Sequence, residues 1–188
     1  RSTMPDLWLP TGGDPLTSHR VESWWADLLD SDDAPLGRLD GVTGGAVEQN
    51  VSRVISGCGT LDVTDRGQDV DWLSARVQVW WQVAGVDSWP LGVYLCSAPV
   101  AAHTDAGVSW RVELLDKLLV LDEDKVDGSY SVAAGATVTD AVATLIASAG
   151  ETATAVTDST ETLSAGMVWP AGTSKLRVIN DLLAAINY

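Results

Sequence analysis

The sequence predicts a mainly β fold with an α+β C-terminal part: an antiparallel β-barrel followed by a small subdomain that contains helices. Between about residues 20 and 117, apolar side chains alternate with polar ones in short runs separated by turn residues. After residue 117 the apolar spacing becomes helical. Hydrophobic residues make up 46% of the chain, enough for a sizeable core, so we expect a folded protein rather than a disordered one.

Three segments follow from these patterns. Residues 1–18 are rich in Pro, Gly, Asp and Thr and form an irregular lead-in. Residues 19–120 form the antiparallel β-barrel domain, and residues 121–188 form the α+β subdomain. No internal repeat with a fixed period is visible in the sequence.

Both ends of the chain suggest a piece of a longer protein. Arg1, Ser2 and Thr3 precede Met4, which is typical of a vector remnant before a start methionine. At the other end, Tyr188 falls inside a helical pattern that has no stop signal. We therefore expect an N-terminal fragment that is truncated at its C-terminus.

Seven strands are expected in the β domain. The alternation is clearest where Val77, Val79, Trp81 and Val83 are interleaved with other residues, because a period of two places them on one face. Tight turns between the runs favour an antiparallel meander that closes into a barrel or sandwich. The strands are expected near residues 20–29, 36–42, 46–55, 60–64, 75–84, 91–97 and 108–116.

Two helices are expected in the C-terminal segment. Thr137 is a candidate N-cap with Asp140 as the acidic third position, and Gly150 is a natural stop for this helix. A second helix begins at Thr173 or Ser174. Its apolar stripe would face the barrel or the missing C-terminal part, and it consists of Leu176, Ile179, Leu182, Leu183 and Ile186.

The composition limits the classes of function. The formal net charge is −15, with 11 basic and 26 acidic residues, which disfavours binding to nucleic-acid phosphates. There is no apolar run of the ~20 residues that a membrane span requires, and no signal peptide is visible. Cys58 and Cys96 lie far apart without a metal-binding spacing, so we expect two free thiols, with one disulfide as the alternative.

The search for catalytic, cofactor and metal sites yields no candidate. His19 and His103 are the two histidines, and we interpret both as solvated residues because no nucleophile motif accompanies them. The segment 122–128 resembles a calcium loop, but its fifth position is Val126, and Asp127 displaces the required glycine. We interpret it as an acidic surface loop. The segment 11–15 contains two glycines but lacks the lysine of a phosphate loop, and the carboxylates of Asp30, Asp32 and Asp33 fit a turn.

The nine tryptophans are the most unusual feature of the composition. Trp24-Trp25 and Trp80-Trp81 are adjacent pairs on expected strands, so one ring of each pair should leave the core. Trp81 belongs to the apolar set, which places Trp80 on the opposite face. An outward tryptophan suggests either sugar stacking or a wall covered by protein, and we favour the latter.

Several segments together resemble actinobacteriophage minor tail proteins of the tail-hub type. They cover nearly everything from His19 to Tyr188 and comprise residues 19–24, 27–33, 35–37, 39–45, 67–73, 88–93, 112–118 and 170–176. This family is similar to the baseplate hub of contractile-tailed phages. The resemblance implies β-barrel domains arranged as a homotrimer around a channel for DNA or a tape-measure protein.

The resemblance implies a structural, non-enzymatic virion protein at the tail tip, a hub or baseplate protein that caps the tail tube. Its expected partners are other tail proteins: the tail tube or distal tail protein, the tape measure and downstream tip proteins. The alternative is a carbohydrate- or host-receptor-binding module, and a cell-wall hydrolase is the third hypothesis. The acidic balance suits a DNA channel, because like charge prevents the wall from gripping DNA, so we expect acidic residues on the channel side.

Overall fold

The computed structural model describes residues 21–50, 52–105 and 107–187, so the predicted lead-in, His19 and the segment 11–15 lie outside the described residues. The chain divides into two compact units. Unit 1 comprises the described residues up to Gln49 together with Gly57–Leu114. Unit 2 comprises Asn50–Ser56 and the described residues from Leu115 onward. The segment Asn50–Ser56, which we expected within the β domain, thus packs with the C-terminal part.

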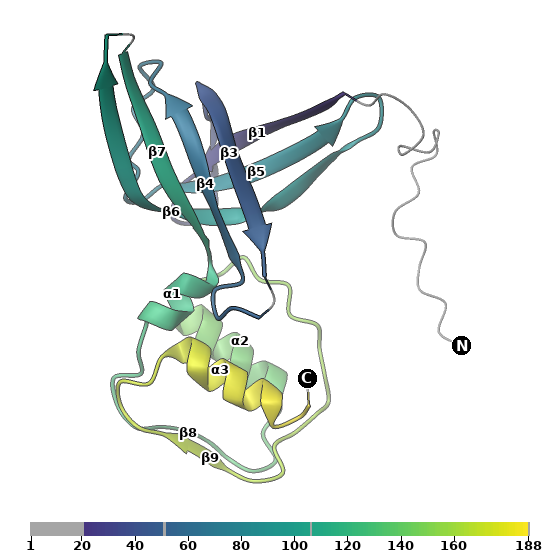
Figure 1. Ribbon diagram of the computed structural model, residues 1–188. Coiled ribbons are helices and arrows are strands. Elements are labelled where there is room, and N and C mark those ends of the chain that lie inside the picture. Colours follow the sequence, from purple (N-terminus) through teal and green to yellow (C-terminus); the bar gives the residue numbers. More distant parts are fainter. Residues whose placement is uncertain (1–20, 51, 106, 188) are drawn as a thin grey trace. The chain divides into compact units, whose positions relative to one another are not determined.

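Unit 1 is built on one seven-stranded sheet whose strand order is β2-β1-β5-β6-β7-β4-β3. Figure 1 labels each of these strands except β2. The number of strands agrees with the sequence prediction, and every strand pairing with a described register is antiparallel. The strands are β1 (Glu22–Leu29), β2 (Pro35–Arg38), β3 (Val42–Gln49), β4 (Gly57–Thr64), β5 (Arg76–Val83), β6 (Ser88–Thr104) and β7 (Gly107–Asp116).

The predicted fold class is confirmed, but the sheet is not closed into a barrel, because β2 and β3 are its two edges. The chain passes from β2 to β3 through a corner at residues 39–41. There the Leu39 N–H donates to the Ala26 carbonyl (2.9 Å), and the Thr64 N–H donates to the Gly41 carbonyl (2.8 Å). These bonds tie the corner to β1 and to the end of β4. The two edge strands are therefore neighbours in sequence without forming a ladder with each other.

β6 joins the two halves of the sheet. Residues Ser88–Leu95 pair with β5, whereas the rest of the strand continues beyond the end of β5 and turns directly into β7. Ala98, just past this change of partner, has a positive φ of 43°. Such a conformation is uncommon for a residue with a Cβ and marks a local irregularity in the strand. The inner faces of the two halves meet in one core that contains Ala26, Leu28, Leu39, Leu61, Val63, Trp72, Ala75, Val77, Val79, Tyr94, Val112 and Leu114.

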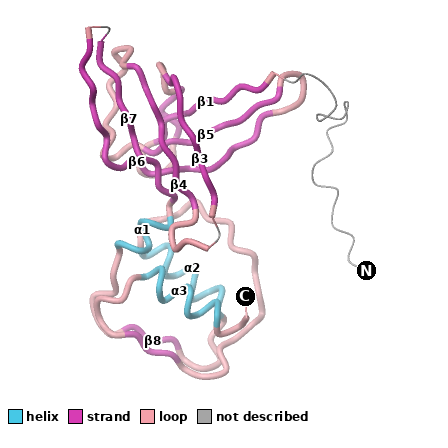
Figure 2. Tube along the Cα trace, viewed as in Figure 1, coloured by secondary structure: helices cyan, strands magenta, loops and turns pink. Residues whose placement is uncertain are grey.

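Unit 2 contains all the described helices and a two-stranded sheet (Figure 2). Its elements are α1 (Leu118–Glu123), β8 (Tyr130–Val132), α2 (Val138–Ser148), β9 (Met167–Trp169) and α3 (Lys175–Ala184). The second core is formed by Leu121, Val132, Val138, Val142, Leu145, Leu163, Trp169, Leu176, Val178, Ile179 and Leu182, with Ile55 packed against it.

Both predicted helices are present. Ser174 is the N-cap of α3, and its Oγ accepts a hydrogen bond from the Arg177 N–H (3.2 Å), as expected for this residue type. Thr137 occupies the N-cap position of α2 but makes no side-chain cap bond. Its backbone instead forms an isolated bridge to Thr162, and the Val138 N–H donates to the Glu161 carbonyl. A neighbouring segment thus satisfies the backbone there. The predicted N-cap position of Thr137 and the acidic Asp140 in the first turn are confirmed, but Thr137 makes no side-chain cap bond.

Unit 2 contains a strand–turn–helix arrangement twice, which the expectation of no internal repeat missed. β8 leads into α2 and β9 leads into α3, each through a turn whose glycine has a positive φ, 81° at Gly135 and 82° at Gly172. The N-caps Thr137 and Ser174 follow at the same spacing and share an extended conformation. Because β8 and β9 pair antiparallel, the two halves are related by an approximate twofold arrangement.

Candidate functional site

The two tryptophan pairs of unit 1 divide between the faces of the sheet as predicted. In the β1–β5 ladder Trp24 lies opposite Trp81, and Trp25 lies opposite Trp80. The first pair shares its face with the buried Ala26–Val79 pair of the core. Trp25 and Trp80 therefore lie on the outer face, which confirms that one ring of each sequence pair leaves the core.

An apolar hollow opens on the inner face of the sheet, and we call it the tryptophan hollow. Its volume is about 180 Å³. The ring of Trp24, 40% exposed, forms part of its wall. A Cβ on Gly45 would lie 3.3 Å from the Trp24 ring and 2.6 Å from the Thr60 carbonyl, so this glycine lets β3 approach the ring. The lining consists of Trp24, Gly45, Ala46, Val47, Thr60, Leu61, Val79, Trp81, Leu91 and Leu114 and includes no charged residue.

The size and chemistry of the hollow suit an apolar side chain. Sites that enclose small-molecule ligands typically measure ~300–1,000 Å³, which is larger than this hollow. An apolar cavity of about 150 Å³ is enough to take up benzene. The one tryptophan N–H with a described acceptor here is that of Trp81, which donates to Glu22 (3.2 Å). The hollow therefore offers shape and apolar contact but no described array of hydrogen-bonding groups.

On the outer face, Arg38, Trp25 and Trp80 form a ladder across three adjacent strands. The Trp25 and Trp80 rings are stacked with centroids 6.1 Å apart and planes inclined by 13°. The Arg38 guanidinium lies 4.5 Å from the centroid of Trp25, and its Nε donates to Asp27 (3.0 Å). Such a cation–π contact stabilises by about 0.5–1 kcal/mol when exposed. Both faces of Trp25 are thus directed at protein groups.

The packing of Trp80 in this ladder argues against the interpretation that Trp80 stacks on a sugar. A sugar ring binds tryptophan through an open ring face, but one face of Trp80 is turned to Trp25. Across the β5–β6 ladder Trp80 lies opposite Pro90, the neighbour on its other side. The indole N–H groups of Trp25 and Trp80 are buried and have no hydrogen-bond partner. This geometry favours a wall of packed rings over a sugar platform.

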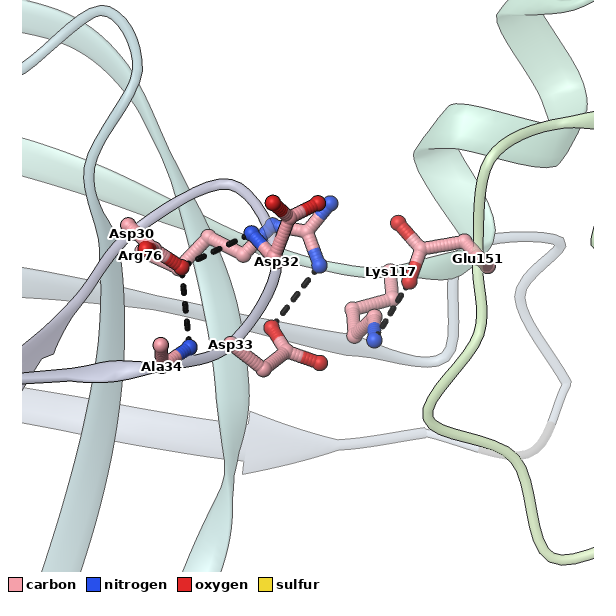
Figure 3. Close-up of polar contacts among 7 residues, drawn as sticks. All are labelled: Asp30, Asp32, Asp33, Ala34, Arg76, Lys117 and Glu151. Atoms are coloured by element: carbon pink, nitrogen blue, oxygen red, sulfur yellow. Dashed lines mark hydrogen bonds and ion pairs between the residues drawn. The ribbon is translucent and has the colours of Figure 1, made fainter.

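The acidic turn between β1 and β2 is a structural feature, as the sequence predicted (Figure 3). Asp30 Oδ1 accepts hydrogen bonds from the backbone N–H groups of Asp32 (2.9 Å) and Ala34 (2.8 Å). A further contact of this turn had no signal in the sequence. Arg76, only 8% exposed, donates to Asp33 at 2.8 Å, and Asp33 has a left-handed φ of 64°. The turn is therefore anchored to β5 by an ion pair whose side chains are 10% and 16% exposed.

A second buried ion pair lies in unit 2, where Lys117 contacts Glu151 (Figure 3). Glu151 is 5% exposed. In the predicted acidic loop, Asp124 ends α1 and accepts a hydrogen bond from Lys175 at 2.6 Å. Val126, the residue that broke the calcium-loop pattern, is buried. Glu151 and Asp124 thus form ion pairs with lysines of the same unit, and these pairs link segments that are far apart in the sequence.

The structure brings no catalytic group together with His103 in the described part of the chain. His103 is exposed near the end of β6. Cys58 and Cys96 are half-buried and not joined by a disulfide, and burial raises the pKa of the Cys96 thiol to about 12. Within residues 21–50, 52–105 and 107–187, no three His, Cys, Asp or Glu side chains gather as a metal ion would require. None of the described helices is long and apolar enough to cross a membrane.

The second half of β6 is the other notable surface of unit 1, and we call residues 97–104 the β6 arm. Its pairing with β5 has ended before it begins, so among the described residues it has β7 on one side and no strand on the other. Val100 is 61% exposed, and Ala98 and Ala102 are also exposed. An open apolar strand edge is a template for pairing with another chain.

The fold is shared with solved structures of tail proteins. A tail protein from Neisseria meningitidis matches with a TM-score of 0.57 and 10% sequence identity, over 87% of this chain and 45% of that one. The 43 kDa tail protein of prophage MuSo2 from Shewanella oneidensis matches with a TM-score of 0.55 and 13% identity, over 85% of this chain and 47% of that one. This chain thus spans less than half the length of either.

No protein-family model matches the sequence, and comparison with curated protein sequences finds no match. At 10–13% identity, the two structural matches establish a common fold. A fold alone does not determine a function, because function depends on sites carried by the fold.

Proposed function

We propose that this protein is a structural, non-enzymatic component of a bacteriophage tail tip, a hub or baseplate protein that caps the tail tube and lines the DNA channel. The observation that supports it most strongly is the shared fold with two tail proteins, which extends over both units, since more than four fifths of the chain is aligned. The resemblance of the sequence to actinobacteriophage tail-hub proteins supports the same role independently.

The proposal is tested by locating the protein in virions. An antibody against this chain, detected by electron microscopy on intact particles, is expected to label the tail tip. Labelling of the capsid or the tail shaft, or a complete lack of the protein in purified particles, would contradict the proposed role. Particles from a phage that lacks the gene serve as the control for nonspecific labelling.

The proposed partners are the tail tube or distal tail protein, the tape measure and downstream tip proteins, with the protein itself as a homotrimer. Light scattering on the protein is expected to give the mass of three chains. A strict monomer at high concentration would contradict the trimer. The chain covers 45% and 47% of the length of the two tail proteins that it matches.

The net charge of −15 supports a channel wall that does not hold DNA. A negative surface repels phosphates over a Debye length of ~8 Å at physiological salt. Gel-shift and anisotropy measurements with duplex DNA are expected to show no binding even at low salt, where attraction to a basic surface would be strongest. A channel wall that proves neutral or basic in the assembled tip would contradict this part of the proposal.

The absence of enzymatic activity is part of the proposal and has its own test. Zymography with host cell-wall material is expected to show no lysis by the intact chain, and a clear zone would contradict it. The alternative, a carbohydrate- or receptor-binding module, predicts glycan-array binding that is lost in Trp80→Ala. The stacking of Trp80 on Trp25 leads us to expect no such binding.

A further inference from the structure

We propose that residues 7–9 dock in the tryptophan hollow of their own chain, with the indole ring of Trp8 inserted between Trp24 and Leu91. The hollow is then a binding site for the N-terminal segment of the same molecule. The proposal goes beyond the tail-tip role and does not depend on it. It gives an occupant to an apolar surface that the described residues leave open.

The hollow opens directly onto the core of unit 1. Three of its lining residues, Leu61, Val79 and Leu114, belong to that core and are at most 3% exposed. At the rim, Trp24 is 40% and Leu91 is 36% exposed. Covering large apolar side chains with another apolar group is favourable, because it removes their surface from water. An apolar occupant would therefore extend the core.

The size and the lining of the hollow suit an aromatic ring. Its volume is about 180 Å³. A cavity of about 150 Å³ takes up benzene, and the indole ring is larger than benzene. Trp24 and Trp81 both line the hollow, and aromatic rings with centroids about 4.5–7 Å apart attract each other beyond the effect of burial alone. An indole ring is thus a better match than a small aliphatic side chain.

The N-terminal segment contains the matching group. Leu7, Trp8 and Leu9 are consecutive, and Trp8 is the one aromatic residue among the first 20. Residues 7–13 include no charged side chain, and neither does the lining of the hollow. Insertion of this stretch therefore requires no charged group to lose its hydration.

The connection between Trp8 and the hollow is long enough for this contact. Trp24 follows Val21 by three residues, or about 10 Å of strand. The 13 residues from Trp8 to Val21 span up to about 40 Å when extended. To reach Trp24, the segment has to reverse its direction, and residues 10–15 contain two prolines and two glycines, the residue types that form turns.

The covalent connection favours this occupant over a second copy or a separate apolar partner. A group joined to its site by a short linker is present there at an effective concentration on the order of millimolar. Two separate chains, each with a net charge of −15, repel each other instead. Docking within one chain brings no second set of charges to the hollow.

The first experiment detects the contact by chemical linking. Thr11→Cys and Ala46→Cys are combined in one 188-residue chain, because Ala46 is exposed at the wall of the hollow. The chain is treated at low concentration with a short bis-maleimide, and the linked peptides are identified by mass spectrometry. A mixture with isotopically labelled chains separates links within one chain from links between two. We expect a link between positions 11 and 46 of the same chain.

Two substitutions in this doubly substituted chain test the role of Trp8. Trp8→Ser should lower the yield of the link at short reaction times by roughly fivefold or more, because the apolar group that holds the segment in place is lost. The matched control is Leu16→Ser, which removes an apolar side chain of the same segment outside residues 7–13. It is expected to leave the yield unchanged. Both positions precede β1, so neither substitution alters the core of unit 1.

The second experiment observes the rings by fluorine NMR of the chain labelled with 5-fluorotryptophan. Trp8→Ser and Trp24→Phe assign the resonances of these two residues. In the otherwise unaltered chain, the Trp8 resonance is expected to be protected from a soluble paramagnetic probe. The Trp24 resonance should shift in Trp8→Ser and stay in place in Leu16→Ser, because the Trp8 ring lies against Trp24 in the docked segment.

Four outcomes would overturn the inference. They are the absence of a link between positions 11 and 46, a link that forms between two chains alone, equal yields for Trp8→Ser and Leu16→Ser, and a Trp8 resonance that is as accessible to the probe as that of an unfolded chain. A link between two chains alone would assign the hollow to a second copy. None of these results bears on the labelling of virions, so failure of this contact is distinguishable from failure of the proposed tail-tip role.

Discussion

Gly41, at the corner between the two edge strands, provides a quantitative test of how unit 1 is held together. Its φ is +77°, a conformation that costs an L-residue about 1–2 kcal/mol. A Cβ at this position would also lie 2.0 Å from the Thr64 carbonyl oxygen, a backbone atom that cannot rotate away. In Gly41→Ala the corner must therefore move away from the end of β4.

The movement would break the hydrogen bond from the Thr64 N–H to the Gly41 carbonyl, whose net contribution is about 0.5–1.5 kcal/mol. Adding the two effects, we expect Gly41→Ala to lower the free energy of unfolding of unit 1 by about 1.5–3.5 kcal/mol. Gly67 and Gly85 are matched controls because they have φ values of +82° and +79°, and a Cβ at either position would meet no atom within 4 Å. Their alanine variants should lose only about 1–2 kcal/mol.

Urea unfolding followed by tryptophan fluorescence is the suitable assay. Apart from Trp169, every tryptophan of the described chain belongs to unit 1, so the signal reports mainly on that unit. If Gly41→Ala loses no more stability than Gly67→Ala, the contact between residues 39–41 and the end of β4 does not stabilise unit 1. That result would refute the role assigned to this corner in the open sheet.

Four further variants test three other features of the structure. Asparagine tolerates the left-handed conformation of Asp33, so Asp33→Asn removes only the charge that faces Arg76. Urea unfolding should show that the free energy of unfolding falls by about 1.5–3 kcal/mol. An unchanged unfolding midpoint would contradict the contribution of this ion pair. Burial raises the pKa of Cys96 from 9.0 to about 12, so the thiol keeps its proton in the folded state while it ionises in the unfolded chain. The contribution of the Cys96 thiol to stability is therefore complete below about pH 9 and is lost as the pH rises toward 12. Cys96→Ala should remove this part of the pH dependence of stability. A Cys96 thiol that reacts with iodoacetamide at about pH 8 as fast as a thiol of the unfolded chain would contradict this prediction. Ser174→Ala should lower the free energy of unfolding by about 1 kcal/mol, because it removes the cap hydrogen bond of α3. Thr137→Ala should lower it by less, because Thr137 makes no side-chain cap bond. Unfolding followed by circular dichroism of the helices measures both, and equal losses would contradict the cap assignment.

The agreement between sequence and structure is best where a local rule applies. The split of the tryptophan pairs follows from the alternation of side chains along a strand, and it is confirmed for Trp25 and Trp80. The start of α3 was predicted at Thr173 or Ser174, and Ser174 is the N-cap whose side chain makes the expected bond. In the turn after β1, Asp30 binds two backbone N–H groups as its residue type suggests.

The failures concern elements too short for a periodic signal and contacts between distant segments. β8 and β9 have three residues each, and α1 has six, so none completes enough periods to be recognised. Thr137 had the right residue type and position for a cap, but the segment around Thr162 satisfied the backbone instead. The duplicated strand–turn–helix was missed because its two halves share turn geometry and apolar spacing more than residue identity.

Local patterns in the amino-acid sequence were enough to assign most strands, the two longer helices and the core-facing side of β5, since these depend on residues close together along the chain. The open sheet, the change of partner of β6 at Leu95 and the meeting of Asp33 with Arg76 became visible in three dimensions alone. The tryptophan hollow belongs to the same class, because its lining comes from strands spread over Trp24 to Leu114. Strand partners and cavities are set by contacts between residues far apart in sequence, and no local spacing records which of these contacts forms.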